Sequence, residues 1–206
     1  MNRAVLHDNL SLEVTDEQWV HLEFLLTTHL KWNQVYNLSA HRSADDVFLY
    51  QIVDSLTVHA HVKPGNLLDV GTGPGFPGLP LAIVCPDVSV CLLDSNNKKL
   101  AFARHVVHQL NLKNVTVVHS RIEQFQPVDA FNQIISRAFT DLDGMIEVTK
   151  HLLAPSGSIL AMKGSRASDE VKQAQSSHSE FELTVDELPH AVNESRVLVK
   201  ATRKQP

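Results

Sequence analysis

The chain alternates regularly between short apolar runs and longer segments whose apolar residues recur at helical spacing. Five apolar runs predict buried strands, at 66–70, 88–93, 115–119, 131–136 and 157–162. Helical spacing follows them, near 77–84, 97–110, 141–152 and 167–176. Repeated strand–helix units predict a doubly wound α/β fold, in which helices cover both faces of a mostly parallel sheet.

Two helices are expected before the first strand. Thr15 and Gln18 form a predicted capping box, followed by apolar residues at helical spacing: Trp19, Leu22, Leu25, Leu26 and Leu30. A second helix is predicted from Ser43, with a buried face made of Val47, Tyr50, Val53, Leu56 and Ala60. We expect 1–63 to be a helical extension of one domain, 1–206, whose Rossmann-like core is 64–206.

The C-terminal segment has a different pattern. Residues 181–188 and 195–202 read as two strands joined by a connection that contains proline and asparagine. With no helical segment between them, they predict an antiparallel hairpin that closes the sheet.

A glycine-rich turn at 71–78 separates the first strand of the sheet from the helix after it. Such a turn lets the backbone approach a ligand, and Pro77 suits the first helical position. The free N–H groups of the helix start would face a polar or anionic ligand group. Residues 73–78 also satisfy the G-x-G-x-x-G pattern, which is weak evidence alone, because a tight turn with no ligand would also fit.

An acid at the end of the second strand strengthens the ligand interpretation. Asp94 follows the glycines by about 20 residues, where a carboxylate holds the hydroxyls of a ribose. A nicotinamide cofactor and S-adenosylmethionine both fit this arrangement. Asp69, before the first glycine, favours S-adenosylmethionine, because a carboxylate attracts an ammonium or sulfonium group and repels a pyrophosphate.

Composition and charge narrow the class of protein. The chain has 206 residues, of which 43% are hydrophobic and 20% are charged, as in ordinary globular proteins. It has no signal-peptide pattern and no apolar run of membrane-spanning length. Its two cysteines, Cys85 and Cys91, predict no disulfide framework. We therefore expect a cytoplasmic protein with no membrane partner.

The net charge of −5 is unevenly distributed along the chain. From Ser95 to Ile122 there is no acidic residue but a charge of +5, from Lys98, Lys99, Arg104, Lys113 and Arg121. Thirteen basic and 23 acidic residues remain elsewhere, a balance of −10. The basic segment predicts a surface for RNA phosphates, with a solvated helix face as the alternative.

Several short motifs occur in a family-specific order. They are Trp32-Asn33 with Asn37-Leu38, Asp54-Ser55, the run from Asp69 to Gly78, Leu93-Asp94-Ser95, Lys98-Lys99, Ser136-Arg137-Ala138 and Lys163-Gly164. From about residue 15 onward the chain resembles the bacterial 16S ribosomal RNA methyltransferase G family, also called glucose-inhibited division protein B. The resemblance implies a class I methyltransferase that transfers a methyl group from S-adenosylmethionine to N7 of a guanosine. That guanosine lies in the decoding-region loop of the small-subunit rRNA.

The resemblance and the strand pattern together give candidate site residues. Those expected to bind the cofactor are Asp69, Gly71, Gly73, Gly75, Phe76, Asp94, Ile122, Glu123 and Arg137. Ile122 would pack on the adenine, and Glu123 or a neighbouring backbone group would address its amino group. Arg137, after the fourth strand, is the catalytic candidate because it would lie near both cofactor and base. The RNA-binding candidates are Lys98, Lys99, Arg104, Arg121, Lys163 and Arg166.

Other polar residues are given structural interpretations. We expect Trp32 to pack in the core, and Asn33 and Asn37 to serve as turn and cap residues. Asp54 would either approach the cofactor or cap a loop. The family commonly has Phe-Asp before the fourth strand, whereas here Asn132 follows Phe131, so a carboxylate role there is doubtful.

The expected partners follow from the resemblance and from what the sequence lacks. His105 and His108 are three residues apart, but no third ligand supports a metal site. The expected partner is 16S rRNA or the small ribosomal subunit, bound by a monomer. One alternative is a methyltransferase for a small molecule or a protein. Another is a Rossmann protein that is non-enzymatic or binds nicotinamide.

Overall fold

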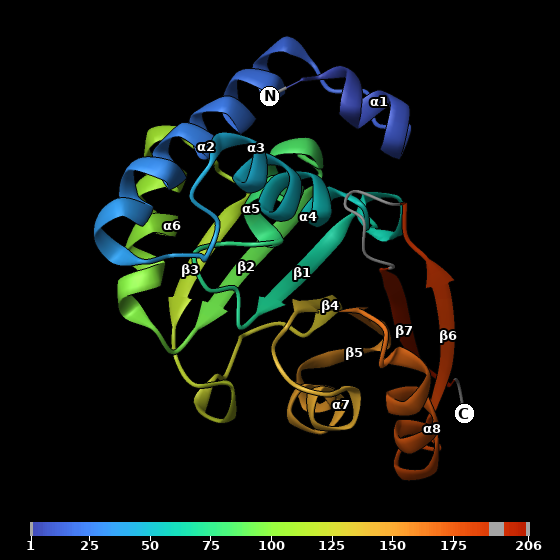
Figure 1. Ribbon diagram of the computed structural model, residues 1–206. Coiled ribbons are helices and arrows are strands. Elements are labelled where there is room, and N and C mark those ends of the chain that lie inside the picture. Colours follow the sequence, from blue (N-terminus) through green and yellow to red (C-terminus); the bar gives the residue numbers. More distant parts are fainter. Residues whose placement is uncertain (1, 190–195, 205–206) are drawn as a thin grey trace.

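A seven-stranded sheet forms the centre of the computed structural model, which describes residues 2–189 and 196–204. Its strands are β1 (Gly65–Val70), β2 (Val88–Asp94), β3 (Val115–His119), β4 (Phe131–Arg137), β5 (Leu153–Lys163), β6 (Phe181–Glu187) and β7 (Val197–Arg203). They are arranged in the order β3-β2-β1-β4-β5-β7-β6 (Figure 1). The first five are parallel, and β7 runs antiparallel to both β5 and β6. The predicted fold class and the closing hairpin are confirmed.

The helices cover both faces of this sheet (Figure 1). The α-helices are α1 (Ala4–Leu10), α2 (Asp16–Tyr36), α3 (Ala44–Val47), α4 (Asp54–Leu56), α5 (Gly78–Val84), α6 (Asn97–Gln109), α7 (Leu142–Thr149) and α8 (Ala167–Ser177). A π-helical segment, η1 (Phe48–Val53), joins α3 to α4. Short 3₁₀ turns are η2 (His59–His61), η3 (Ile122–Gln124) and η4 (Lys150–Leu152). No helix of the described residues is long and apolar enough to cross a membrane.

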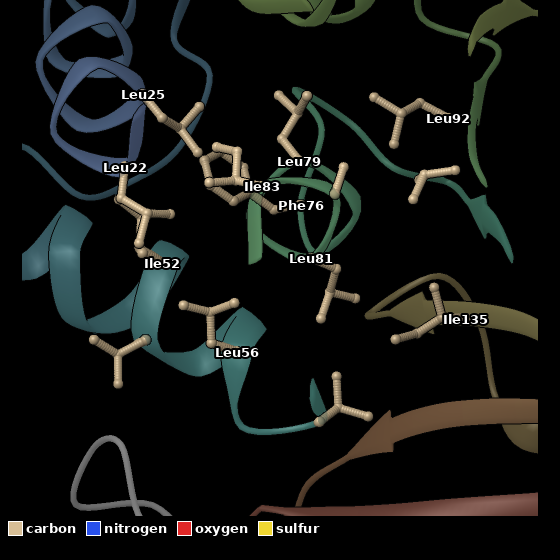
Figure 2. Close-up of a cluster of buried hydrophobic side chains, with 14 of the residues drawn as sticks. Leu22, Leu25, Ile52, Leu56, Phe76, Leu79, Leu81, Ile83, Leu92 and Ile135 are labelled. Atoms are coloured by element: carbon tan, nitrogen blue, oxygen red, sulfur yellow. The ribbon is translucent and has the colours of Figure 1, made fainter. Parts of the chain in front are cut away.

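Two apolar clusters hold the layers together, one on each face. Alternation along a strand sends Leu67 of β1 to one cluster and Leu68 to the other. The first cluster joins the N-terminal helices to α5, α6 and the sheet. Figure 2 shows Leu22 and Leu25 of α2 near Phe76 and Leu79 of the α5 region. The second cluster packs α7 and α8 on the opposite face.

The N-terminal helices differ partly from the prediction. The capping box of Thr15 and Gln18 is confirmed at the start of α2, whereas α1 was not predicted. The expected second helix does follow Ser43, but it contains the π-helical segment and ends at Leu56. The buried face was wrong at Tyr50, which is half-buried, and at Ala60, which is exposed. Tyr50 lies within the π-helical segment, which changes the direction of its side chain, and Ala60 lies beyond the end of the helix.

Other boundaries shift by a few residues. Pro77 is the N-cap of α5 rather than its first residue, and α7 passes into η4 at Lys150. β5 begins at Leu153, four residues earlier than predicted, because Leu153 pairs with Phe131. The last strand begins at Val197, and the predicted start at residue 195 lies outside the described residues.

Candidate cofactor and substrate site

The glycine turn lies at the carboxyl end of β1, where the sheet order reverses between β1 and β4. Gly71 and Gly75 have φ angles of 67° and 104°, which side-chain-bearing residues rarely adopt. A Cβ on Gly71 would also lie 2.5 Å from Cδ2 of Phe139, and one on Gly75 would lie 2.4 Å from Cδ1 of Leu79. The turn therefore requires glycine at both positions.

Asp69 fixes this turn from inside the protein. Its Oδ2 accepts hydrogen bonds from Thr72 Oγ1 at 2.6 Å and from the Gly78 N–H at 2.8 Å. Burial raises the pKa of Asp69 to about 7, although these hydrogen bonds favour the charged form. Its Oδ1 is buried and has no hydrogen-bond partner among the described residues. Asp69 therefore shapes the turn from a fully buried position.

Asp94 stands at the end of β2, beside the same turn. Its Oδ2 accepts the Gly73 N–H at 2.7 Å and its Oδ1 accepts the Asn96 N–H at 2.6 Å. Two backbone donors therefore set the orientation of the carboxylate. Each oxygen keeps a second lone pair for a ligand hydroxyl.

A cavity of about 310 Å³ opens at these strand ends and is called the adenosyl cavity below. Its lining includes Gly71, Asp94, Ile122 and Glu123, so the structure brings together four of the predicted cofactor residues. Ile122 is buried in η3, whereas Glu123 is exposed. Gly73 adjoins the cavity through its bond to Asp94.

Two of the predicted cofactor residues lie behind the turn rather than on the cavity. The ring of Phe76 is 4% exposed and belongs to the first apolar cluster, so its side chain supports the turn from below. Asp69 is fully buried beneath the turn. The turn backbone covers both side chains, so a part for either residue in cofactor binding would be through the turn and stays a prediction.

Sequence reasoning missed Ala138 and Phe139, which follow β4. Phe139 covers Gly71 and lines the adenosyl cavity while remaining 37% exposed. Ala138 has a φ of 57°, in the left-handed region that a non-glycine residue adopts only with strain. Backbone strain of this kind clusters at functional sites, but no local sequence pattern predicts it.

Arg137 at the end of β4 is held by three hydrogen bonds to the N-terminal helices. It donates to the Tyr50 carbonyl at 2.8 Å, to Asp54 Oδ2 at 2.8 Å and to Gln51 Oε1 at 2.6 Å. Its guanidinium also lies 6.0 Å from the ring centroid of Phe76. Arg137 thus joins the segment η1–α4 to the ligand edge of the sheet.

Asp54 corrects both interpretations offered for it. The side chain is 1% exposed and pairs with Arg137 and, through Oδ1 at 3.2 Å, with Nε of Arg196. It neither lines the adenosyl cavity nor caps a loop. Its partners are 83 and 142 residues away in sequence, a separation at which local patterns carry no signal.

A second cavity, of about 490 Å³, lies next to Arg137 and is called the substrate cavity below. Its cationic lining residues are Arg137, Lys163, Arg166 and Arg196. His41 and Tyr50 line another part of its wall. Ala138 lines both cavities, so they meet at the residue after Arg137.

The RNA-binding candidates have different surroundings in the structure. Lys98 and Arg104 are exposed on α6, and Arg104 donates to Asn97 Oδ1 at 2.8 Å. Lys99 instead packs beside the glycine turn, where a Cβ on Gly73 would lie 3.8 Å from its Cδ. Arg121 lines the adenosyl cavity, and exposed Arg166 lines the substrate cavity.

Lys163 has partners within the protein. Its Nζ lies 2.8 Å from Glu170 Oε2 and donates to the Thr140 carbonyl at 2.6 Å, and the side chain is only 11% exposed. It therefore fixes the loop after β4 to α8, a role that sequence reasoning did not foresee.

The remaining polar predictions concern the N-terminal signature. Trp32 packs against the core and contacts Phe102 and His105. Buried Asn33 binds the following loop, and Asn37 is the C-cap of α2, so both structural roles are confirmed. Asn132 accepts the Asn66 N–H at the amino end of β4, away from the ligand edge. No group of three or more potential metal ligands occurs in the described part of the chain.

Structures with a similar fold are methyltransferases. An O-methyltransferase from Bacillus cereus in complex with SAH has a TM-score of 0.62 and is 15% identical, covering 97% of this chain and 96% of that one. A SAM-dependent methyltransferase from Aquifex aeolicus has a TM-score of 0.60 and is 19% identical, covering 77% of this chain and 93% of that one. At these identities the likeness concerns the fold alone.

The sequence comparisons are more specific. Ribosomal RNA small subunit methyltransferase G of Psychromonas ingrahamii is 42% identical over 202 residues, which are 98% of this chain and 97% of that protein. The protein of the same name from Photobacterium profundum is 39% identical over 193 residues, 94% of each chain. The family described as rRNA small subunit methyltransferase G matches residues 18–199. The resemblance predicted from the motifs is thereby confirmed, and the chain belongs to the rRNA small subunit methyltransferase G family.

Proposed function

We propose that this protein transfers a methyl group from S-adenosylmethionine to N7 of a guanosine in 16S rRNA. The adenosyl cavity next to a cationic substrate cavity, in a member of this family, is the observation that carries the proposal. We also propose that it acts as a monomer, in the cytoplasm. Residues 1–63 would belong to the same domain as the sheet, since their leucines share its first apolar cluster.

The residues at the glycine turn fit this cofactor. The Asp94 carboxylate has the position and free lone pairs to hold the two ribose hydroxyls. Buried Ile122 offers an apolar wall for the adenine, and Glu123 stands at its edge. Asp69, buried beneath the turn, would act by fixing the turn backbone through Thr72 and Gly78, and a negative charge there would favour a positively charged group of the ligand nearby. When bound, the cofactor would supply an activated methyl group on sulfur.

Guanine N7 is a reasonable acceptor for such a site. N7 carries a free lone pair, so no general base has to remove a proton before it reacts. Among the described residues lining the substrate cavity, Glu170 is the carboxylate, and it is occupied by Lys163 and the Leu142 N–H. Catalysis would rest on holding the two reactants in line and excluding water.

Arg137 remains our candidate for the residue nearest the reacting atoms. Both hydrogens of its NH1 are used by Tyr50 and Asp54, which leaves Nε and one hydrogen of NH2 for a ligand. Arg137 would therefore hold the guanine base through these two remaining donor groups. The exposed Lys98 and Arg104, with Arg121 and Arg166 at the cavity mouths, would contact RNA phosphates. Lys99 would act nearer to the cofactor.

Methylation mapping tests the reaction. Purified protein, S-adenosylmethionine and small subunits from a strain that lacks the endogenous enzyme should give one new N7-methylguanosine in 16S rRNA by mass spectrometry. Methylation at another atom would overturn the N7 assignment. Methylation of a protein or a small molecule, with none of the RNA, would support the alternative.

Calorimetry tests the cofactor site. We expect S-adenosylhomocysteine to bind and NADH not to bind. Replacing Asp94 with Ala should weaken S-adenosylhomocysteine by about 1–3 kcal/mol, the usual cost of losing hydrogen bonds to a charged group. Asp129→Ala, which removes an exposed carboxylate that does not line the adenosyl cavity, is the control. Equal affinities of the two variants would remove Asp94 from the site.

A further inference from the structure

The substrate cavity contains an aromatic pair that the cofactor does not explain. The rings of His41 and Tyr50 are stacked, with centroids 4.6 Å apart and planes inclined by 3°. Both side chains are half-buried, and both line the cavity beside Arg137. Two parallel rings at the wall of a cationic cavity offer a surface on which a third flat ring can stack.

The loop that carries His41 is held rigidly by α2. Asn33, which is 1% exposed, donates to the His41 carbonyl at 2.7 Å and accepts the Ser39 N–H at 2.9 Å. Arg42 donates to the Asn33 carbonyl at 2.7 Å and so closes the loop. The His41 ring is therefore positioned before any ligand binds, which reduces the entropy lost on binding.

Tyr50 comes from the other side, on the segment η1. Its backbone carbonyl accepts a hydrogen bond from Arg137, so the Tyr50 backbone is fixed relative to the end of β4. The residue after Arg137, Ala138, also lines the adenosyl cavity. The aromatic pair thus belongs to a cavity that borders the adenosyl cavity at Ala138, where the methyl group would be presented.

We infer that the target guanine, turned out of its RNA strand, stacks on the His41–Tyr50 pair during the reaction. This inference rests on the proposed function. An N7 that must attack cannot also accept a strong hydrogen bond, so the base has to be held by its face and its far edge. Stacking supplies that hold, and it leaves the N7 edge free to point toward Ala138. Exposed Arg166 in the lining would contact a phosphate beside the turned-out nucleotide.

The test separates the aromatic face from the volume of the ring. Tyr50→Leu and His41→Leu keep apolar bulk but remove the π face, whereas Tyr50→Phe and His41→Phe keep it. We expect each Leu variant to lower kcat/KM for the small subunit by about 5- to 100-fold, as loss of one base–aromatic stack does. Each Phe variant should stay within about threefold of wild type, because most of the stacking area is kept.

Binding of S-adenosylhomocysteine shows whether the variants are folded. Its affinity should not change in any of the four variants, since neither ring lines the adenosyl cavity. Tyr36→Leu, the same substitution at the other tyrosine of the chain, is the matched control and should retain full activity. If Tyr50→Leu fails to fold, His41→Leu decides the question, because His41 lies in a loop outside the helices.

The outcomes distinguish this inference from the function on which it rests. Wild-type enzyme that methylates the RNA, together with Leu variants of unchanged kcat/KM, would overturn the stacking role alone. Equal losses in the Leu and Phe variants would also overturn it, by showing that packing of the native ring matters rather than its π face. Wild-type enzyme that does not methylate RNA would overturn both.

Discussion

At the scale of single residues, Asp69 is the group whose acidity folding changes most clearly. Burial raises its pKa from 3.8 to about 7, against the hydrogen bonds from Thr72 and Gly78. The native state therefore holds a proton that the unfolded state releases between these two pKa values. Raising the pH through this range should lower the free energy of unfolding, because unfolding releases the proton.

Asp69→Asn tests this dependence. The amide keeps the size of the side chain and does not titrate. We expect the free energy of unfolding of the wild type, relative to that of the variant, to fall between about pH 4 and about pH 7. Urea unfolding of both proteins at several pH values measures it. A difference that is constant over the range would show that burial does not shift this carboxyl.

At the scale of elements, one buried carboxylate holds the N-terminal helices to the sheet. Asp54 is the first residue of α4. Its partner Arg137 ends β4, and its other partner, Arg196, directly precedes β7. Removing one member of a buried ion pair leaves the others buried without compensation. This explains why a residue that touches neither cavity should nevertheless matter to the site.

Asp54→Asn should lower the free energy of unfolding by about 3 kcal/mol, which is the lower end of the losses measured when a buried ion pair is broken. Glu147→Gln breaks the exposed pair with Lys150 on α7 and should cost about 0.5 kcal/mol or less. Denaturant unfolding compares the two variants. A similar small loss in both would mean that solvent reaches Asp54 well enough to replace its arginines.

The sequence predicted elements better than it predicted contacts between them. β3 was placed without error, and β1, β2 and β4 within one residue, because each is an apolar run bounded by polar or turn residues. The turn glycines and Asp94 were found for the same reason, since their spacing is local. Three features depend on packing between distant segments: the anchor at Asp54, the cover formed by Phe139 and the different surroundings of Lys98 and Lys99. No local period encodes those features.

At the scale of the whole molecule, the basic residues that are close in sequence have different positions in the structure. Of the basic segment on and around α6, Lys98 and Arg104 face solvent, while Lys99 lies beside the glycine turn. A double substitution of Lys98 and Lys99 would therefore mix an effect on RNA with one on the cofactor. Lys98 and Arg104 are the better pair for testing the RNA surface.

Lys98→Ala with Arg104→Ala should weaken RNA binding and reduce the salt dependence of the affinity by about one to two phosphate contacts. S-adenosylhomocysteine affinity should stay the same in this variant and fall in Lys99→Ala. RNA binding measured at several salt concentrations, with calorimetry for the cofactor product, gives both quantities. An unchanged salt slope would place the RNA on another surface.

The π-helical segment sets two halves of one helix out of phase. Each residue of an α-helix turns the chain by about 100°, so one extra residue rotates everything after it by that angle. Before the segment, Val47 belongs to the cluster shared with α2; after it, Asp54 reaches the arginines. A chain shortened by one residue here would form a more regular helix, yet it would turn Asp54 away from its partners. At this point of the chain, the irregular helix is therefore what allows Asp54 to pair with its arginines.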